Sequence, residues 1–195
     1  MSEEIVAAAT SLLQSGSASA VTLRAVAREA GITAPSIYRH YADLDAVLRA
    51  VVDRAFDELE ATLRAAYVGD RATDRLRAVC TAYLSFAREQ PNLYRVMFGV
   101  VWNAGDSGPE PTSEELDARA KLGLRAFEVL VTGIAECIEE GRSTSADPGT
   151  DAAALWVGLH GLSTLRQTAP SFPWPGGLED SLVDSLARLT EPTES

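Results

Sequence analysis

The sequence predicts an all-α protein made of a small N-terminal domain and a larger helical body. Apolar residues recur at intervals of three and four along most of its 195 residues, the spacing of one helix face, and alternating strand-like runs are scarce. With 46% hydrophobic residues, a chain of this length buries a substantial core without disulfide or metal cross-links. We place the domains at residues 1–45 and 46–195.

The first two helices are defined by their apolar faces and their end residues. One is expected from about Ser2 to Gln14, followed by a Ser-Gly-Ser break. The next is expected over Leu23–Ala30, with Thr22 as its N-cap and Gly31 at its end.

A short third helix and a long fourth helix follow. The third begins after Thr33, which can cap it, and ends near Tyr41. It carries Pro35 in its first turn, where a missing N–H has no cost. Asp43 then caps a helix that reaches about Val68, long enough to connect two bodies.

Explicit breaks divide the rest of the chain. Further helices are expected at about Thr73–Gln90, Asn92–Val101, Ser113–Glu140, Thr150–Ala169 and Leu178–Leu189. Pro91 separates the first two of these, and loops are expected at residues 103–111, 141–149 and 170–177.

Residues 22–41 have the pattern of a helix-turn-helix, two short helices joined by a turn that contains Gly. In that motif the second helix enters the major groove of DNA with its N-terminal residues forward. Small residues that allow close approach to base edges are Ala34, Pro35 and Ser36. Hydroxyls suited to phosphate oxygens are those of Thr22, Thr33 and Ser36. Helix pairs of this kind also occur as ordinary packing units.

The segment from the capping Thr through Gly to Ile-Tyr-Arg-His-Tyr resembles the DNA-binding domain of the TetR family of transcriptional regulators. The resemblance covers about Ile5–Leu63. It implies a DNA-binding set of Thr22, Arg24, Thr33, Ala34, Pro35, Ser36, Tyr38, Arg39 and His40. Tyr38 and His40 would contact phosphates, and Arg24 would form a bidentate pair with guanine. As alternatives, Tyr38 is a core aromatic, and Arg24 and Arg39 are solvated surface charges.

One position departs from the family pattern. The family usually has Lys three residues after the closing aromatic, and this chain has Leu44 there. The loss of that cation predicts weaker and less salt-sensitive DNA binding.

Charge is unevenly distributed along the chain. Its net charge of -11 would repel a polyanion. However, residues 22–49 contain four Arg against three acidic residues, a net of +1, which leaves -12 for the remainder. The acidic total therefore does not exclude DNA binding; it predicts a modest affinity that is readily lost in salt.

The larger body contains aromatic and polar residues in the combination typical of a small-ligand site. The residues expected to bind an apolar effector are Tyr83, Phe86, Tyr94, Met97, Phe98, Trp102, Phe127, Trp156 and His160. Trp156 to Gly161 and Pro91 to Phe98 resemble segments of the WHG-type TetR C-terminal domain. The alternative is a purely structural role, in which the aromatic residues form the core and His160 is a hydrogen-bonded structural histidine.

Two apolar stripes, over residues 155–165 and 178–189, suit a helical interface. The family resemblance implies that the protein is a homodimer. It also implies that the dimer binds a palindromic operator in double-stranded DNA. The alternative is that these stripes cover the core of a monomer. The function implied is that of a repressor released by the effector. The competing interpretation is an all-helical protein-interaction module that has lost DNA binding.

Catalytic, metal and membrane functions are not expected. The two cysteines, Cys80 and Cys137, form no C-x-x-C pair, and His40 and His160 are far apart in sequence. We find no glycine-rich phosphate loop and therefore expect no enzyme, cofactor or metal. The acidic N-terminus and the absence of an apolar run of about 20 residues predict a cytoplasmic protein without a membrane span.

Overall fold

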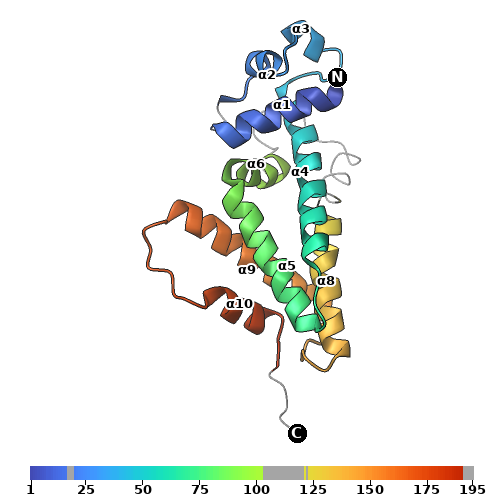
Figure 1. Ribbon diagram of the computed structural model, residues 1–195, viewed down its shortest axis with the longest axis vertical. Coiled ribbons are helices and arrows are strands. Elements are labelled where there is room, and N and C mark those ends of the chain that lie inside the picture. The colour runs from blue at the N-terminus through green and yellow to red at the C-terminus, as the bar shows by residue number, and fades with distance from the viewer. Residues whose placement is uncertain (17–19, 103–120, 122, 191–195) are drawn as a thin grey trace. The chain divides into compact units, whose positions relative to one another are not determined.

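The computed structural model describes residues 1–16, 20–102, 121 and 123–190. Its elements are the helices α1 (Ser2–Ser15), α2 (Leu23–Glu29), α3 (Ala34–Ile37), α4 (Leu44–Ala66), α5 (Ala72–Glu89), α6 (Pro91–Trp102), α8 (Leu124–Glu139), α9 (Pro148–Thr168) and α10 (Leu178–Leu186). Among the described residues the only strand-like pairing is one isolated bridge, between Ser143 and Leu189. The all-α prediction is confirmed (Figure 1).

The chain forms two compact units. The N-terminal unit comprises Met1–Glu58 and Gln90–Leu122, and the C-terminal unit comprises Leu59–Glu89 and Gly123–Ser195. Helix α4 contributes its first part to one unit and its last part to the other.

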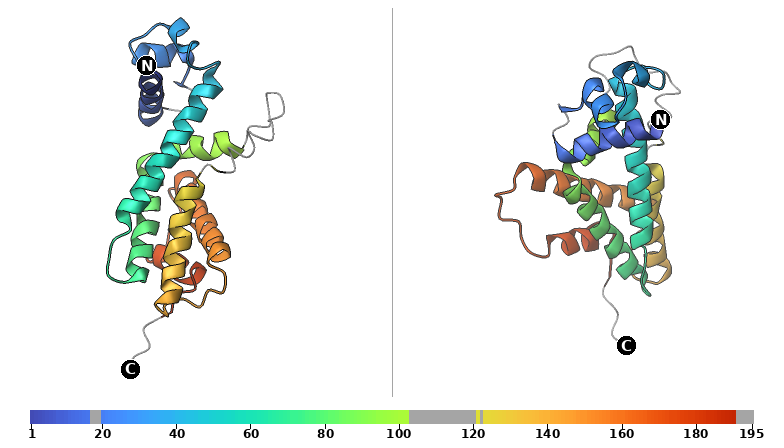
Figure 2. Two further views of the ribbon diagram at one scale, coloured as in Figure 1. Left: turned by 90° about the vertical axis from the view of Figure 1, so that its right-hand side faces the viewer. Right: turned by 45° about the horizontal axis from the view of Figure 1, so that its top comes forward.

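In the N-terminal unit, α1 packs against both α2 and α6 (Figure 2). Ile5, Ala9 and Leu13 recur on one face of α1 and are fully buried, as their spacing predicts. The Asn92 side chain donates to the Gly16 carbonyl oxygen at 2.6 Å, which ties α6 to the end of α1. Helix α6 therefore packs with the first helices, although it follows α5 in the chain. The functional boundary at residues 45 and 46 stays a prediction.

In the C-terminal unit, α8 and α9 lie side by side and α5 packs against both (Figure 2). Leu76, Ile134 and Leu155 come from these three helices and are fully buried. Helix α10 lies on α9 at Gly158, where a Cβ atom would come within 2.7 Å of the Leu186 side chain. The glycine thus permits a close helix approach within one chain.

Three helix ends differ from the prediction by three residues or more. Helix α8 begins at Leu124 because Gly123, with φ of 80°, adopts the left-handed conformation just before it. Helix α10 ends at Leu186, since Leu189 pairs with Ser143 instead of continuing the helix. The third case, α3, belongs to the functional site. The predicted loop at 103–111 and the predicted helix from Ser113 to residue 120 lie outside the described residues.

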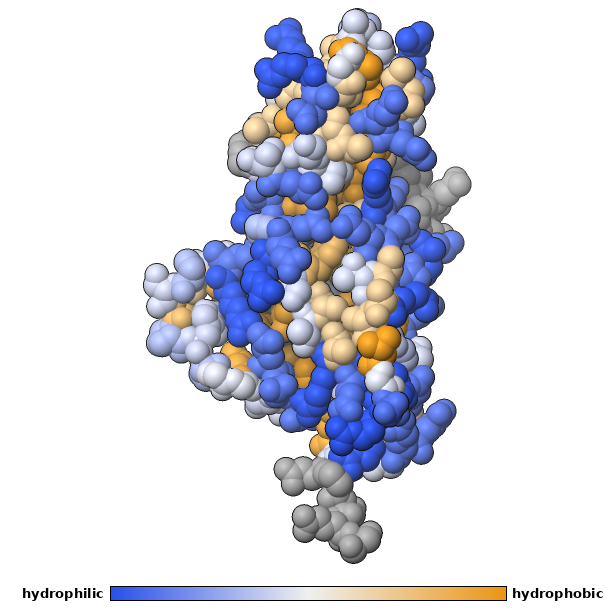
Figure 3. Space-filling model, in the orientation of Figure 1, coloured by the Kyte–Doolittle hydropathy of each residue, from blue (hydrophilic) through white to orange (hydrophobic). Residues whose placement is uncertain are grey.

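The apolar stripe predicted on α9 is divided between the core and the surface. Leu155, Leu159 and Leu162 are buried in the core of their own chain, so the monomer-core interpretation holds for these three. Val157 and Leu165 are 64% and 52% exposed. On the face shown in Figure 3, polar and charged residues cover most of the helical surface.

Candidate functional site

The helix-turn-helix predicted from residue spacing is present in the N-terminal unit. Its first helix is α2, and the Thr22 hydroxyl accepts a hydrogen bond from the Ala25 amide at 3.1 Å. This cap satisfies one of the amides that a helix leaves unpaired at its start. The predicted capping role of Thr22 is confirmed.

Gly31 shapes the turn between α2 and α3. Its φ of 67° lies in the left-handed region, where a residue with a Cβ atom is strained. The Ile32 amide donates to the Ala27 carbonyl oxygen at 2.9 Å, which closes the end of α2. Thr33 then occupies the N-cap position of α3, as predicted, but its side chain makes no capping hydrogen bond to the helix.

Helix α3 is one turn long and shorter than predicted, because it ends at Ile37 and not near Tyr41. The amides of His40 and Tyr41 both donate to the Ile37 carbonyl oxygen, at 2.8 and 3.0 Å. Sharing one acceptor between two donors makes a tight turn and stops the regular helical pattern. Ile37 is fully buried, so it anchors α3 in the core of the N-terminal unit.

The nine predicted DNA-binding residues lie on this one motif, and most of them face solvent. The exposed members are Thr22, Arg24, Thr33, Pro35, Tyr38, Arg39 and His40. Ala34 and Ser36 are half-buried, and the Ser36 hydroxyl lies 2.8 Å from the Thr33 hydroxyl, within hydrogen-bond distance. Tyr38 is 59% exposed, so it is not a core aromatic. Its neighbour Ile37 occupies the core position instead.

Three arginines of the motif, Arg24, Arg28 and Arg39, are exposed and make no ion pair within the described residues. A guanidinium group without a carboxylate partner keeps its planar set of N–H donors available. Those donors match the oxygens of a phosphate and the major-groove edge of guanine. The motif therefore presents unpaired cations on a protein that is acidic overall.

Two contacts of the motif were not anticipated from spacing. The hydroxyls of Ser2 and Tyr41 lie 2.6 Å apart and join the start of α1 to the residues that follow α3. The Ser11 hydroxyl donates to the Glu29 carboxylate at 3.0 Å and joins α1 to α2. These contacts hold the helix pair on α1. The aromatic residue at position 41 was the available signal, but it indicated only where the motif ends.

The start of α4 carries an acidic cap and no cation. The Asp43 carboxylate accepts a hydrogen bond from the Ala46 amide at 2.7 Å. Leu44 is the first residue of α4 and is half-buried. A negative charge thus occupies the helix start at which a Lys would attract a phosphate.

The predicted effector residues are distributed over both units. Tyr83 and Phe86 are buried in the C-terminal unit, and Tyr94 and Met97 are buried in the N-terminal unit. Phe98 packs its ring against the rings of Phe56 and Tyr94, also in the N-terminal unit. The side chain of Trp102 lies outside the part of the chain described.

Three predicted effector residues do come together on α8 and α9. The ring of Trp156 lies 6.5 Å from that of Phe127 and 6.4 Å from that of His160, measured between centroids. Burial lowers the pKa of His160 below its ordinary value, which favours the neutral imidazole at pH 7. This group is apolar with one uncharged polar member.

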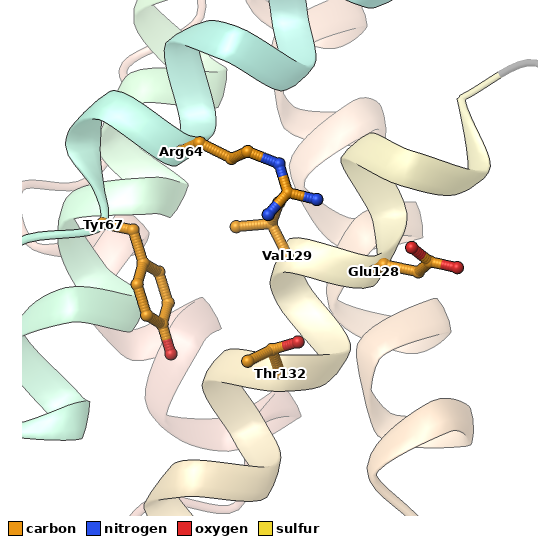
Figure 4. Close-up of a pocket in the computed structure, with 5 residues that line it drawn as sticks. All are labelled: Arg64, Tyr67, Glu128, Val129 and Thr132. Atoms are coloured by element: carbon orange, nitrogen blue, oxygen red, sulfur yellow. The ribbon is translucent and has the colours of Figure 1, made fainter.

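A cavity of about 230 Å³ lies in the C-terminal unit and was not predicted (Figure 4). Its lining residues come from the end of α4, from the residue after it and from α8, and are Arg64, Tyr67, Glu128, Val129 and Thr132. Burial, with Glu136 beside the hydroxyl, raises the pKa of Tyr67 to about 12, so the phenol stays protonated. No signal in the sequence indicates this cavity, because its lining residues come from separate segments and form no motif.

In the part of the chain that the structure describes, no group of His, Cys, Asp or Glu side chains is arranged to hold a metal ion. None of the described helices combines the length and apolar character needed to cross a bilayer.

Two family models match the chain. One, for bacterial regulatory proteins of the tetR family, matches residues 5–51, and the other, for the tetracyclin repressor-like C-terminal domain, matches residues 76–189. The chain belongs to the TetR family. The first match contains the complete helix-turn-helix, and the second extends from within α5 past the end of α10 to Leu189. Assignment to the WHG type stays a prediction.

Three individual proteins are similar to this chain in sequence or in structure. The uncharacterized HTH-type transcriptional regulator Rv0681 of Mycobacterium tuberculosis is 29% identical over 120 residues, which cover 62% of this chain and 54% of that protein. The chain thus spans about half the length of this relative. A protein of unknown function from Rhodococcus sp. RHA1 has a similar structure, with a TM-score of 0.74 at 26% identity over 95% of this chain and 91% of that one. SmeT of Stenotrophomonas maltophilia has the same fold, with a TM-score of 0.67 at 19% identity over 100% and 93% of the two chains.

Proposed function

We propose that this TetR-family protein is a transcriptional repressor that binds a palindromic operator as a homodimer and is released by a small, largely apolar ligand. The observation that carries the proposal is the exposed helix-turn-helix with its unpaired arginines, Arg24, Arg28 and Arg39. Its proposed activity is binding and not catalysis. Because its target is DNA, we propose that it works in the cytoplasm.

The proposed DNA contacts are those that the resemblance to the TetR family implies, and they agree with the chemistry of the side chains. Arg24 reads guanine in the major groove, while Tyr38 and His40 donate to phosphates. Pro35 and the half-buried Ala34 pack against thymine methyl groups. The other members of the set, which bind phosphate or a base, are Thr22, Thr33, Ser36 and Arg39.

Dimerisation is proposed through α9, whose exposed apolar residues Val157 and Leu165 lie on a helix otherwise anchored in the core. A two-fold axis places two recognition helices on two half-sites, which makes the operator palindromic. SmeT is the repressor of a multidrug efflux pump, and this supports repression by analogy of fold alone.

The effector is proposed to bind in the C-terminal domain, at residues 46–195. The ring group of Phe127, Trp156 and His160 supports an apolar ligand. The 230 Å³ cavity is smaller than most ligand pockets, so only a small molecule fits without rearrangement. Release requires that the ligand favour one conformation of the protein by its own binding energy. Equal operator affinity with and without a candidate compound excludes that compound as the effector.

Selection of duplexes from a random DNA pool, by the full-length protein at one stated salt concentration, tests DNA binding. We expect enrichment of a palindromic sequence. The Arg24→Ala variant should lose this enrichment, whereas Arg88→Ala, which removes an exposed arginine at the end of α5, should retain it. No enrichment by the unmodified protein would contradict the proposal and favour the alternative, an all-helical interaction module without DNA binding.

A further inference from the structure

A second cavity, of about 450 Å³, lies in the C-terminal unit, separate from the ring group and from the cavity near Tyr67. It is formed where the start of α5 meets the loop after α8 and the chain after α10. Its charged lining residues are Arg71, Asp74, Arg77, Arg142 and Asp184. Among the lining residues alone, three arginines face two aspartates.

Two of these arginines already have carboxylate partners. Arg71 binds Asp74 through two hydrogen bonds, of 2.8 and 3.0 Å. Arg77 binds Asp184 and also lies 3.3 Å from the Asp180 carboxylate. Their charges are therefore largely balanced.

Arg142 is the arginine without a partner. Its side chain is half-buried and makes no hydrogen bond or ion pair within the described residues. Nearby Glu140 is occupied, because it accepts from the Ala72 amide and from Arg75. A half-buried guanidinium without a carboxylate is costly, and an external anion would offset that cost.

The backbone fixes Arg142 at the cavity. Gly141, with φ of 67°, ends α8, and the Arg142 amide donates back to the Cys137 carbonyl oxygen at 2.7 Å. The Arg142 carbonyl oxygen accepts from the Thr190 amide at 3.0 Å. These two bonds fix the backbone of Arg142 at the cavity before any ligand arrives.

Thr73 supplies a second polar group in the same cavity. It is only 8% exposed, and its hydroxyl makes no hydrogen bond within the described part of the chain. It lies in the first turn of α5, an 18-residue helix whose positive end favours an anion. Because Thr73 lines the cavity, its hydroxyl can donate a hydrogen bond to an anion there.

We propose that this cavity is a binding site for a phosphate group, free or carried on a small ester. Arg142 supplies the charge, the Thr73 hydroxyl donates one hydrogen bond, and Arg71 and Arg77 border the site. A phosphate matches a guanidinium through two parallel hydrogen bonds. The site is independent of the proposed operator and apolar effector.

Isothermal titration of the full-length protein with inorganic phosphate, and separately with glycerol phosphate, tests the proposal at constant ionic strength set by chloride. We expect saturable binding of at least one of the two, and the tighter one identifies the form of phosphate recognised. Arg142→Gln should weaken binding about tenfold or more, because it removes a charge-assisted pair.

Two further variants separate a built site from general charge. Thr73→Val keeps the side-chain shape and should weaken binding roughly threefold to tenfold, as expected for the loss of one hydrogen bond. Arg88→Gln removes the same charge from the other end of α5 and should leave binding unchanged. The proposal is overturned if neither phosphate binds more tightly than chloride, or if Arg142→Gln and Arg88→Gln have equal effects in proteins with unchanged thermal unfolding.

Discussion

The arginines of the helix-turn-helix differ from most arginines of the C-terminal unit in whether they have a carboxylate partner; among the described residues, Arg142 is the exception in the C-terminal unit. Arg24, Arg28 and Arg39 make no ion pair within the described residues. In the C-terminal unit, arginines paired with carboxylates are Arg64, Arg71, Arg75, Arg77, Arg125, Arg166 and Arg188. One residue type thus has two different environments in a single chain.

The pairs in the C-terminal unit position helices relative to one another. Arg77 joins α5 to α10, and Arg166 joins α9 to the same helix. Arg75 has the densest set of contacts, with Glu136 at 2.6 Å, Glu140 at 3.1 Å and the Gly69 carbonyl oxygen at 3.0 Å. An arginine held in this way is not free to bind a phosphate, whereas an unpaired one is.

The largest effect is expected from removing an unpaired arginine. Arg24→Ala should lower affinity for the selected operator roughly 10- to 100-fold and relax the preference at one base pair, because a bidentate guanine contact is lost. Thermal unfolding should stay unchanged, since the exposed side chain makes no hydrogen bond or ion pair within the described residues. Fluorescence anisotropy with the operator and with single-base variants measures this, and an unchanged base preference would refute the assigned contact.

A stability effect of several degrees is expected from removing a paired arginine. Arg75→Met should lower the thermal unfolding midpoint, because it leaves the Glu136 and Glu140 carboxylates close together without their shared partner. Arg88→Met is the matched control on α5, since its exposed pair with Glu89 contributes little. Equal midpoints for the two variants would show that pairing does not distinguish these arginines.

Acid should remove the contribution of Arg75 to the stability of the folded protein. Tyr67 and Arg75 hold the pKa of Glu136 below its ordinary value of 4.5. A depressed pKa stabilises the folded state above pH 4.5, and this stabilisation is lost as the pH falls through the folded-state pKa. The difference in unfolding midpoint between the unmodified protein and Arg75→Met should therefore shrink from pH 7 toward pH 3. A difference that is constant over this range would contradict the assigned ion pair.

The smallest effect is expected at the start of α4. Leu44→Lys restores the cation usual in the family and should steepen the dependence of log affinity on log salt by about one phosphate contact. A lysine at this half-buried position keeps its stem on the protein and extends its ammonium into water. Leu124→Lys, at an exposed residue of the C-terminal unit, is the control. An unchanged slope for Leu44→Lys would exclude a phosphate at this position.

Local signals in the sequence predicted most of the fold. Thr22, Gly31 and Asp43 each set a helix boundary through a cap or a left-handed backbone, and these effects depend on adjacent residues only. The end of α3 was not predicted correctly, because it depends on the folded chain. Ile37 is buried in the core, and its carbonyl oxygen accepts from two amides.

Long-range packing limited the prediction of the site. The predicted DNA-binding residues all belong to one contiguous motif, so recognising the motif in the sequence located all of them at once. The effector set was defined by residue type alone, and the structure places its members in two units. The two cavities join residues distant in sequence, such as Arg71 with Arg142 and Tyr67 with Thr132, which share no periodic pattern.

The salt dependence of operator affinity tests most directly the claim that unpaired arginines of the helix-turn-helix bind DNA. The measurement compares the unmodified protein with Arg24→Gln/Arg28→Gln/Arg39→Gln and with a control that changes Arg64, Arg71 and Arg88 to Gln. We predict a slope of log affinity against log salt that is shallower by about two to three phosphate contacts for the first variant and unchanged for the control. Equal slopes for all three proteins would contradict the account.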